Sequence, residues 1–355
     1  MHLAVDHGRG RQGPVNTHPF DALRPETVLD VVERLGVACD GRLFALNSFE
    51  NRVYLVGRED AEPLVAKFYR PGRLSDDQVL EEHAFLDELA AADLPVAAPL
   101  RDGDGRSLIE VDIAARDASE DAAGHEAARY RVALFPKLRG RAPELEAEEH
   151  LEWLGRLIAR LHQIGAGGQF VHRPPLSIES LGEVGLRATL AGPLLPDGLK
   201  ARFETSVGTL LQRVRAGFTG VGNYRSLRLH GDLHPGNLLW NDDGPVFVDF
   251  DDSGAGPAIQ DLWMLLPGDD EGRRRGLAAL VEGYETFRSF DWREARLIEP
   301  LRALRMIHYG GWLSARYDDP AFPRAFPFAA QARFWEEHML SLEQQAERIS
   351  LEAAP

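Results

Sequence analysis

The segment LRLHGDLHPGNLLWNDDGPVFVDFDD, residues 227–252, constrains the fold and function of this chain more than any other part. Asp232 and Asn237 lie five residues apart on a turn that contains proline and glycine, and Asp249 follows twelve residues after Asn237, at the end of an apolar run. Between them, the tetrapeptide NDDG at 241–244 is typical of a hairpin turn. A hairpin there would fold Asp249 back beside Asn237.

These side chains have the chemistry of a phosphate-transfer site. The oxygen atoms of Asn237 and Asp249 are hard ligands suited to Mg²⁺. Asp232, just before them, is placed to orient or deprotonate an attacking hydroxyl. An Asp, four further residues, an Asn and a later metal-binding Asp occur in this order in the catalytic loop of kinases. Asp and Asn are also common in turns, so one alone would carry little weight, but three in this order favour kinase chemistry.

A second candidate site lies earlier in the chain. Lys67 stands inside the otherwise apolar run LVAKFY, where a buried amine needs a partner. Glu82 follows fifteen residues later on a helix predicted at 78–92, and Glu81 is the alternative partner. In kinases such a Lys contacts the α- and β-phosphates of ATP and is held by a helix Glu. Lys67 on an edge strand reaching water fits the segment equally well, and the Asp232 cluster favours the kinase interpretation.

The predicted secondary structure changes character near residue 136. Strands are predicted at 43–47, 51–56, 64–68, 107–114 and 130–135, and helices at 25–36, 78–92, 151–164, 199–216, 273–287, 292–317 and 329–351. The sequence therefore predicts an α+β fold of two lobes: a small β-rich N-lobe at 20–136 and a larger, mostly helical C-lobe at 137–355. Residues 1–19 are expected to form a flexible tail, and the polar stretch 116–129 a solvated loop.

Composition excludes several classes of protein. The 355 residues carry a formal net charge of -16, which suits neither a nucleic-acid backbone nor an anionic membrane surface. A single cysteine rules out an intramolecular disulfide and argues against a structural zinc site. No apolar run approaches the roughly 20 residues that cross a bilayer, and the first residues lack the apolar centre of a secretion signal. We therefore expect a cytoplasmic protein with no nucleic-acid or membrane partner, and a monomer by default.

The turn expected to cover the phosphates of ATP has an unusual composition. Kinases use a glycine-rich turn there, whereas the corresponding hairpin of this chain, LNSFENRVY at 46–54, contains no glycine. Ser48, Glu50 and Asn51 could form a polar turn whose backbone N–H groups meet phosphate. A plain hairpin without this role fits the residues equally well.

Longer motifs place the chain within a known group. HGDLHPGN with the later VDFDD resembles the aminoglycoside phosphotransferase and choline kinase group of eukaryotic-like kinases. The motifs LNSFENRVY, VAKFYRPGR, LEEH, PVAAP, HRPP, GPAIQDLWMLL, IEPLRALRMIHY and DPAFPRAFP are similar to those of its bacterial stress response kinases. The resemblance runs from about residue 20 to about residue 337. The loop 116–129 looks like an insertion relative to that family, and the N-terminal tail is longer, but neither touches the motifs.

The resemblance implies a bilobed protein-kinase-like fold and the ATP- and Mg²⁺-dependent phosphorylation of Ser/Thr on proteins, the kinase itself included, in bacterial stress survival. It implies the following roles: Asp232 as catalytic base, Asn237 and Asp249 as Mg²⁺ ligands, Ser48 as an ATP contact in the phosphate turn, Lys67 and Glu82 as the ATP-anchoring pair, and Asp251 as a candidate for a second metal. ATP would bind between the lobes near a hinge at Phe135–Leu138. His230 is expected to serve as a scaffold and Asp261 to brace the catalytic loop.

Two other functions remain open at this stage. A small-molecule kinase acting on an amino-alcohol or an antibiotic would share the same catalytic core. A pseudokinase that binds nucleotide as a scaffold ranks last, because Asp232, Asn237 and Asp249 are all present. The sequence indicates neither the physiological substrate nor the upstream signal.

Overall fold

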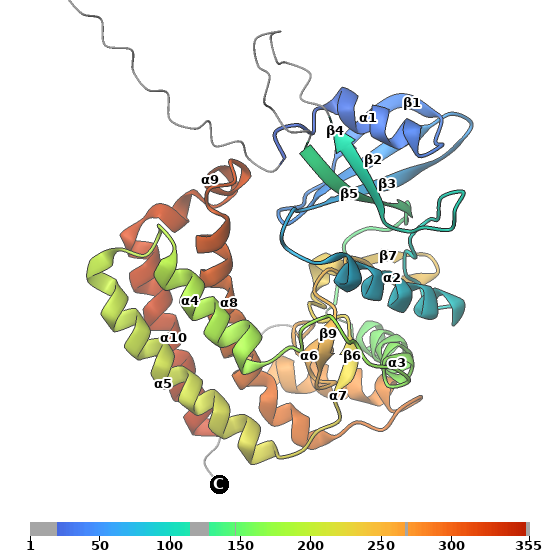
Figure 1. The fold of residues 1–355 in the computed structure, drawn as a ribbon. Helices are drawn as coiled ribbons and strands as arrows, with labels where there is room; N and C mark the ends of the chain where they lie inside the picture. Colours follow the sequence, from blue (N-terminus) through green and yellow to red (C-terminus); the bar gives the residue numbers. More distant parts are fainter. Residues whose placement is uncertain (1–19, 114–127, 146, 267–268, 353–355) are drawn as a thin grey trace, which may run out of the picture.

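The computed structural model describes residues 20–113, 128–145, 147–266 and 269–352, which form two lobes (Figure 1). The smaller lobe contains a five-stranded sheet and the larger lobe is mostly helical, as the sequence predicts. The tail predicted at 1–19 lies outside the described residues, as does most of the loop predicted at 116–129.

The N-lobe sheet is antiparallel, with its strands in the order β1-β2-β3-β5-β4. Its strands are β1 (Cys39–Ala45), β2 (Arg52–Arg58), β3 (Ala61–Tyr69), β4 (Ile109–Ile113) and β5 (Ala128–Pro136). Lys67 lies on the central strand β3, paired with Val53 on one side and Ala133 on the other. The edge-strand interpretation of Lys67 is therefore wrong.

Helices cover the N-lobe sheet. Helix α1 (Pro25–Arg34) buries Val28, Val31 and Val32 against it, at the spacing of one helical face. Helix α2 (Asp76–Ala91) begins at a capping box, in which the Ser75 side chain accepts the backbone N–H of Gln78 and the Gln78 side chain accepts that of Ser75. The buried face of α2 carries Glu82 toward Lys67.

The C-lobe surrounds the predicted catalytic segment with helices. Its helices are α3 (Glu148–Gly165), a π-helical turn (Ile178–Glu183), α4 (Val184–Ala191), α5 (Asp197–Val221), a 3-10 turn (Pro235–Asn237), α6 (Gln260–Trp263), α7 (Asp270–Tyr284), a 3-10 turn (Trp292–Leu297), α8 (Ile298–Arg316), α9 (Ala321–Ala325), a 3-10 turn (Pro327–Ala330) and α10 (Ala332–Glu352). Its short strands are β6 (Leu227–Leu229) paired with β9 (Gly254–Gly256), and β7 (Leu238–Asn241) paired with β8 (Gly244–Phe247). The β7–β8 pair is the hairpin predicted from NDDG.

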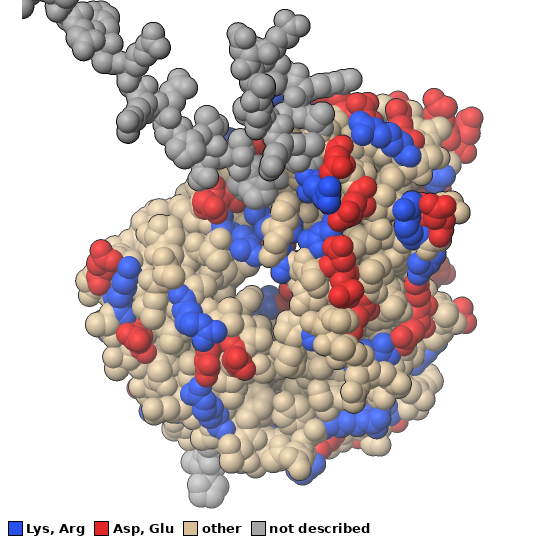
Figure 2. Space-filling view, in the orientation of Figure 1, with Lys and Arg blue, Asp and Glu red and all other residues tan. Residues whose placement is uncertain are grey.

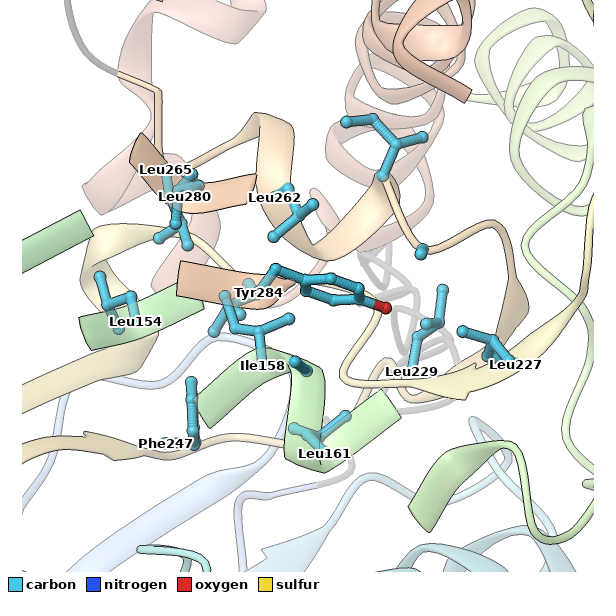
Figure 3. Close-up of a cluster of buried hydrophobic side chains, with 14 of the residues drawn as sticks. Leu154, Ile158, Leu161, Leu227, Leu229, Phe247, Leu262, Leu265, Leu280 and Tyr284 are labelled. Carbon is cyan, nitrogen blue, oxygen red and sulfur yellow. The ribbon is translucent and has the colours of Figure 1, made fainter. Parts of the chain in front are cut away.

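One hydrophobic cluster lies beneath this segment and extends into both lobes. Figure 3 shows the ring of Tyr284 among leucine and isoleucine side chains of α3, α6 and β6. On its other side the cluster includes Phe85 and Leu89 of α2. The short strands of the catalytic segment therefore rest on a packed base that fixes their position.

Two of the places where the lobes meet lie at opposite sides of the molecule. The chain passes from N-lobe to C-lobe after β5 ends at Pro136, and α9 approaches the N-lobe on the opposite side of the molecule (Figure 1). Figure 2 shows an opening near the middle of this face, with Lys and Arg side chains at its edge. Among the described residues, no helix is long and apolar enough to span a membrane.

Candidate active site

The catalytic loop is held from below by one buried carboxylate. Strand β6 ends at Leu229, and the backbone N–H groups of His230 and Gly231 each donate to an oxygen of Asp261, both at 2.8 Å. Gly231 has a φ of 89°, where a side chain would be strained, and an added Cβ would meet the Asp252 carbonyl at 2.1 Å. Asp261 is fully buried and so fixes the turn that leads into Asp232, as the sequence predicts.

His230 and His162 complete this support. The His230 ring packs on Phe250, with centroids 4.4 Å apart, and its Nε2 lies 2.9 Å from the Val248 carbonyl oxygen. His162 places Nε2 3.1 Å from Asp261 Oδ2 and Nδ1 2.9 Å from the Tyr284 hydroxyl. These contacts give His230 the scaffold position expected for it.

Asp232 faces two cationic or ionisable partners. Arg305 of α8 forms an ion pair with Oδ1, and His234 Nε2 lies 3.5 Å from Oδ2. Burial raises the pKa of Asp232, but the hydrogen bond from His234 and the charge of Arg305 outweigh burial and hold the pKa well below its ordinary value. Asp232 is thus an ionised carboxylate, able to accept a hydrogen bond from a hydroxyl.

The β7–β8 hairpin returns the chain toward Asn237. The backbone N–H of Val248 donates to the Asn237 carbonyl oxygen at 3.1 Å, and Asn237 Nδ2 donates to the Asp232 carbonyl oxygen at 2.9 Å. Asp249 then follows with a φ of 61°, a left-handed conformation that Asp adopts more readily than most residues. The chain therefore places Asp232, Asn237 and Asp249 around one turn.

The donor set around Asp249 suits a divalent cation. Desolvation between the lobes, and next the negative charge of Asp251, raise the pKa of Asp249 to about 7, although its side chain is 57% exposed. A positive charge there would counter the charge of Asp251. Within the described ranges, no group of three or more His, Cys, Asp and Glu side chains forms a ready metal site. Asn237 and Asp249 would supply two protein ligands, and phosphate oxygens and water the others, as is common for Mg²⁺.

Lys67 is buried among three carboxylates. It forms an ion pair with Asp251, and its Nζ lies 3.7 Å from Glu82 Oε1 and 3.8 Å from Asp249 Oδ1. Burial lowers the pKa of Lys67, but the charges of Asp251 and Glu82 outweigh burial and raise the pKa well above its ordinary value. The amine therefore stays protonated.

The structure separates the two glutamates that the sequence left as alternatives. Glu82 lies against Lys67 and also 3.3 Å from Arg173 Nη1. Glu81 accepts the backbone N–H groups of Val171, His172 and Arg173 at 2.6–2.9 Å. Glu81 therefore holds a C-lobe loop and is not the partner of Lys67.

The expected phosphate turn lies above these residues. Ser48 Oγ donates to the Asn51 carbonyl oxygen at 3.0 Å, which closes the turn on itself. Asn51 Nδ2 donates to Asp251 Oδ2, and Arg73 Nη1 lies 3.2 Å from the same oxygen. Asp251 is thus occupied by cationic and amide groups from the N-lobe in this structure.

Comparison with known proteins agrees with this geometry. Residues 43–298 match the model of the phosphotransferase enzyme family. The chain is 42% identical, over 90% of its length and 92% of the relative, to the Salmonella typhimurium protein named serine/threonine protein kinase RdoA. It is 40% identical, over 89% of its length and 90% of the relative, to stress response kinase A of Escherichia coli K12.

Solved structures of lower identity share the fold. A structure described as an amicoumacin kinase in complex with AMP-PNP and Ca²⁺ has a TM-score of 0.69 at 19% identity and covers 94% of this chain and 95% of that one. A microcompartment-associated aminopropanol kinase has a TM-score of 0.68 at 19% identity and covers 92% of this chain and 99% of that one. The chain thus belongs to the phosphotransferase enzyme family, together with the bacterial relatives named stress response kinase A.

Proposed function

We propose that this kinase transfers the γ-phosphoryl group of ATP, with Mg²⁺, to Ser or Thr hydroxyls of proteins, itself included, as part of a bacterial stress response. The observation that carries the proposal is the convergence of Asp232, Asn237 and Asp249 with the Lys67–Glu82 pair contributed by the other lobe. The protein substrate and the stress role are supported by the names of relatives at 40–42% identity.

The chemistry assigned to each residue follows from its surroundings. Asp232 accepts a hydrogen bond from the acceptor hydroxyl and takes its proton while that oxygen bonds to the γ-phosphorus and the bond to the leaving ADP oxygen breaks. Lys67, held by Glu82, contacts the α- and β-phosphates, and the turn at Ser48 covers them. Asn237 and Asp249 would hold Mg²⁺, which would supply positive charge to the phosphates. The residues thus position the reactants and stabilise charge.

The acceptor side of the site favours a protein over a polycationic small molecule. The carboxylates there already have arginine partners: Asp232 has Arg305, Glu50 has Arg316, and Asp252 has Arg73 at 2.6 Å. A cationic substrate would have to displace these arginines, whereas a neutral Ser or Thr side chain would not. The small-molecule kinase remains the second candidate, because the neighbours of similar fold include kinases of small molecules.

A phosphate-transfer assay tests the proposal. The wild type, Asp232→Asn and Asp249→Asn are each incubated with labelled ATP and Mg²⁺, with and without a generic protein acceptor. We expect label on Ser or Thr in the wild type, and a loss of about 10²–10⁴-fold in Asp232→Asn, because the general base is gone. ATP affinity, measured separately by calorimetry, should be retained in Asp232→Asn and reduced in Asp249→Asn when Mg²⁺ is present.

Phosphosite mapping and a substrate panel decide between the two candidates. Label on Ser or Thr would support a protein kinase. No label on protein, with ATP consumed only when small amino-alcohols or antibiotics are added, would favour the small-molecule kinase. The cytoplasmic location and the monomeric state expected from the sequence stay predictions.

A further inference from the structure

The loop between β1 and β2, residues 46–51, contacts the C-lobe far from the hinge. The Phe49 ring inserts among three aromatic rings of α8, α9 and the residue after α9, with centroid distances of 6.2 Å to Trp312, 5.8 Å to Phe322 and 4.9 Å to Phe326. Offset and edge-on aromatic pairs at these distances stabilise a contact beyond simple burial. The tip of the expected phosphate turn is therefore packed into the C-lobe.

The next residue, Glu50, adds polar contacts to the same helix. Its Oε1 accepts the indole N–H of Trp312 at 2.5 Å and lies 3.2 Å from Arg316 Nε. Its Oε2 lies 3.2 Å from Arg73 Nε of the N-lobe. Glu50 thus joins arginines of both lobes, and hydrogen bonds to a charged group are stronger than neutral ones.

A buried aspartate in the C-lobe makes the third contact. Asp319 is fully buried, and its Oδ2 lies 2.6 Å from Arg70 Nη2 and 2.9 Å from Arg52 Nη2. Arg70 also donates to the carbonyl oxygens of Phe49 and Glu50, at 3.0 and 2.8 Å. Arg70 therefore connects Asp319 directly to the backbone of the loop.

These contacts account for a turn that has no glycine. In kinases a glycine-rich turn lets the backbone approach phosphate closely. Here the carbonyl oxygens of Phe49 and Glu50 are taken by Arg70, and both side chains are held by the C-lobe. The loop is thus held both by Arg70 of the N-lobe and by side chains of the C-lobe. The contacts lie across the molecule from the hinge, so the two lobes are joined on both sides of the opening (Figures 1 and 2).

We propose that these contacts form an interlobe latch that positions the nucleotide loop and must open for nucleotide to enter and leave. The latch consists of Phe49, Glu50 and Arg70 of the N-lobe with Trp312, Arg316 and Asp319 of the C-lobe. Its C-lobe members are positioning residues: they act on nucleotide through the loop. The proposal rests on the proposed function in one respect, that the loop covers the phosphates of ATP.

The rate of nucleotide release tests the latch. A fluorescent ADP analogue bound with Mg²⁺ is displaced by excess ATP in a stopped-flow instrument, with the wild type, Glu50→Gln, Arg316→Gln, Trp312→Phe and the double variant Glu50→Gln/Arg316→Gln. We expect each single variant to release nucleotide about five- to tenfold faster, because each loses a hydrogen bond to a charged group that holds the latch closed. The double variant should release nucleotide no faster than Glu50→Gln alone, because the contact that Arg316 makes with Glu50 is already weakened in that variant.

Controls separate the latch from general damage. Arg302→Gln changes an arginine of the same helix whose carboxylate partner, Glu299 at 3.0 Å, belongs to the C-lobe, and should leave the release rate unchanged. Trp292→Phe changes an exposed tryptophan and serves as the control for Trp312→Phe. Thermal unfolding of every variant is recorded, and Arg316→Lys, which keeps the charge, should restore part of the slow release.

The outcomes are distinguishable. A wild type that does not bind the ADP analogue would overturn the proposed function. Nucleotide binding with release rates within twofold of the wild type in all three single variants would overturn the latch and leave the proposed function intact. The latch would also be overturned if the single variants release nucleotide faster at an unchanged unfolding midpoint and the effects of Glu50→Gln and Arg316→Gln simply add in the double variant.

Discussion

Arg305 is the residue outside the catalytic loop that has the most direct access to Asp232. It reaches the carboxylate from α8, and its side chain is 44% exposed. An acceptor hydroxyl bound to Asp232 would lie beside this guanidinium, which could stabilise negative charge on the phosphoryl group during transfer. Arg305 would thus act on Asp232 before the acceptor binds and on the reacting groups afterwards.

We expect Arg305→Gln to lower the rate of phosphate transfer about 10- to 100-fold, because one preorganised charge next to the reacting atoms is lost. ATP binding should change little, since Lys67 and the loop at Ser48 are untouched. The measurement is single-turnover transfer from labelled ATP, with ATP affinity measured separately.

Arg302→Gln is the matched control, because it removes an arginine one turn away that pairs with Glu299. Equal rates for Arg305→Gln and the wild type would show that Arg305 serves only as a resting partner of Asp232.

For individual residues of the site, spacing in the sequence predicted some side-chain contacts and missed others. The hairpin signal was enough to bring Asp249 back toward Asn237, because both lie within one short segment. The sequence favoured Glu82 over Glu81 as the partner of Lys67, and Glu82 is the glutamate that lies beside Lys67 in the structure. Local spacing separates the two only weakly, since neighbouring residues on a helix differ in direction by about 100° and the predicted start of α2 was two residues late. Arg305 and Arg173 were missed, because nothing in their local sequence shows which distant carboxylate they meet.

Among the elements, α6 (Gln260–Trp263) depends on a carboxylate from a neighbouring 3-10 turn. Glu294 is buried, and its Oε2 accepts the backbone N–H of Ile259 at 3.1 Å. Burial raises its pKa from 4.5 to about 7. The folded state binds the proton of Glu294 more tightly than the unfolded state does, so protonation of Glu294 stabilises the fold. This contribution to the free energy of unfolding is complete below about pH 4.5 and is lost as the pH rises through 7. Above pH 7 the fold carries a buried, ionised carboxylate at the start of α6.

Glu294→Gln should therefore stabilise the protein at pH 8 and have little effect at pH 5. The gain is at most about 3 kcal/mol, since one pKa unit corresponds to about 1.4 kcal/mol. Thermal unfolding midpoints of both proteins, recorded from pH 5 to 8, should diverge as the pH rises. If the difference between the two unfolding midpoints is the same at every pH, Glu294 does not titrate in this range and the prediction is wrong.

The elements also show where sequence patterns succeed. Helix α1 was predictable because Val28, Val31 and Val32 recur at helical spacing, and a proline begins the helix. Helix α4 and the π-helical turn before it were missed. Residues 174–182, with two prolines and two serines, indicate a loop and include most of the π-helical turn, and α4 is only 8 residues long. Its packing on α8 supplies the order that its own sequence does not.

The whole molecule shares one hydrophobic cluster between its lobes. Phe85 and Leu89 of α2, and Phe135 of β5, belong to the same cluster as Leu154 and Ile158 of α3. Together with the latch and the hinge, this cluster joins the lobes along most of their boundary. We therefore expect the described parts of both lobes to unfold in one cooperative transition.

Leu89→Ala tests this expectation, because all six tryptophans of the chain lie beyond residue 150, in the C-lobe. Trp312 also contacts Phe49 and Glu50 of the N-lobe, so the variant is studied with Trp312 replaced by Phe and the other five tryptophans as reporters of the C-lobe. Removing a fully buried leucine side chain in the N-lobe should cost about 2–5 kcal/mol. If the lobes unfold together, the denaturant midpoint reported by tryptophan fluorescence in the C-lobe falls by the same amount as the denaturant midpoint reported by hydrogen exchange of β3 in the N-lobe. Leu80→Ala, on the exposed face of the same helix, should leave both midpoints unchanged. A fall confined to the N-lobe would show that the shared cluster does not couple the lobes, and that they meet only as separately stable units.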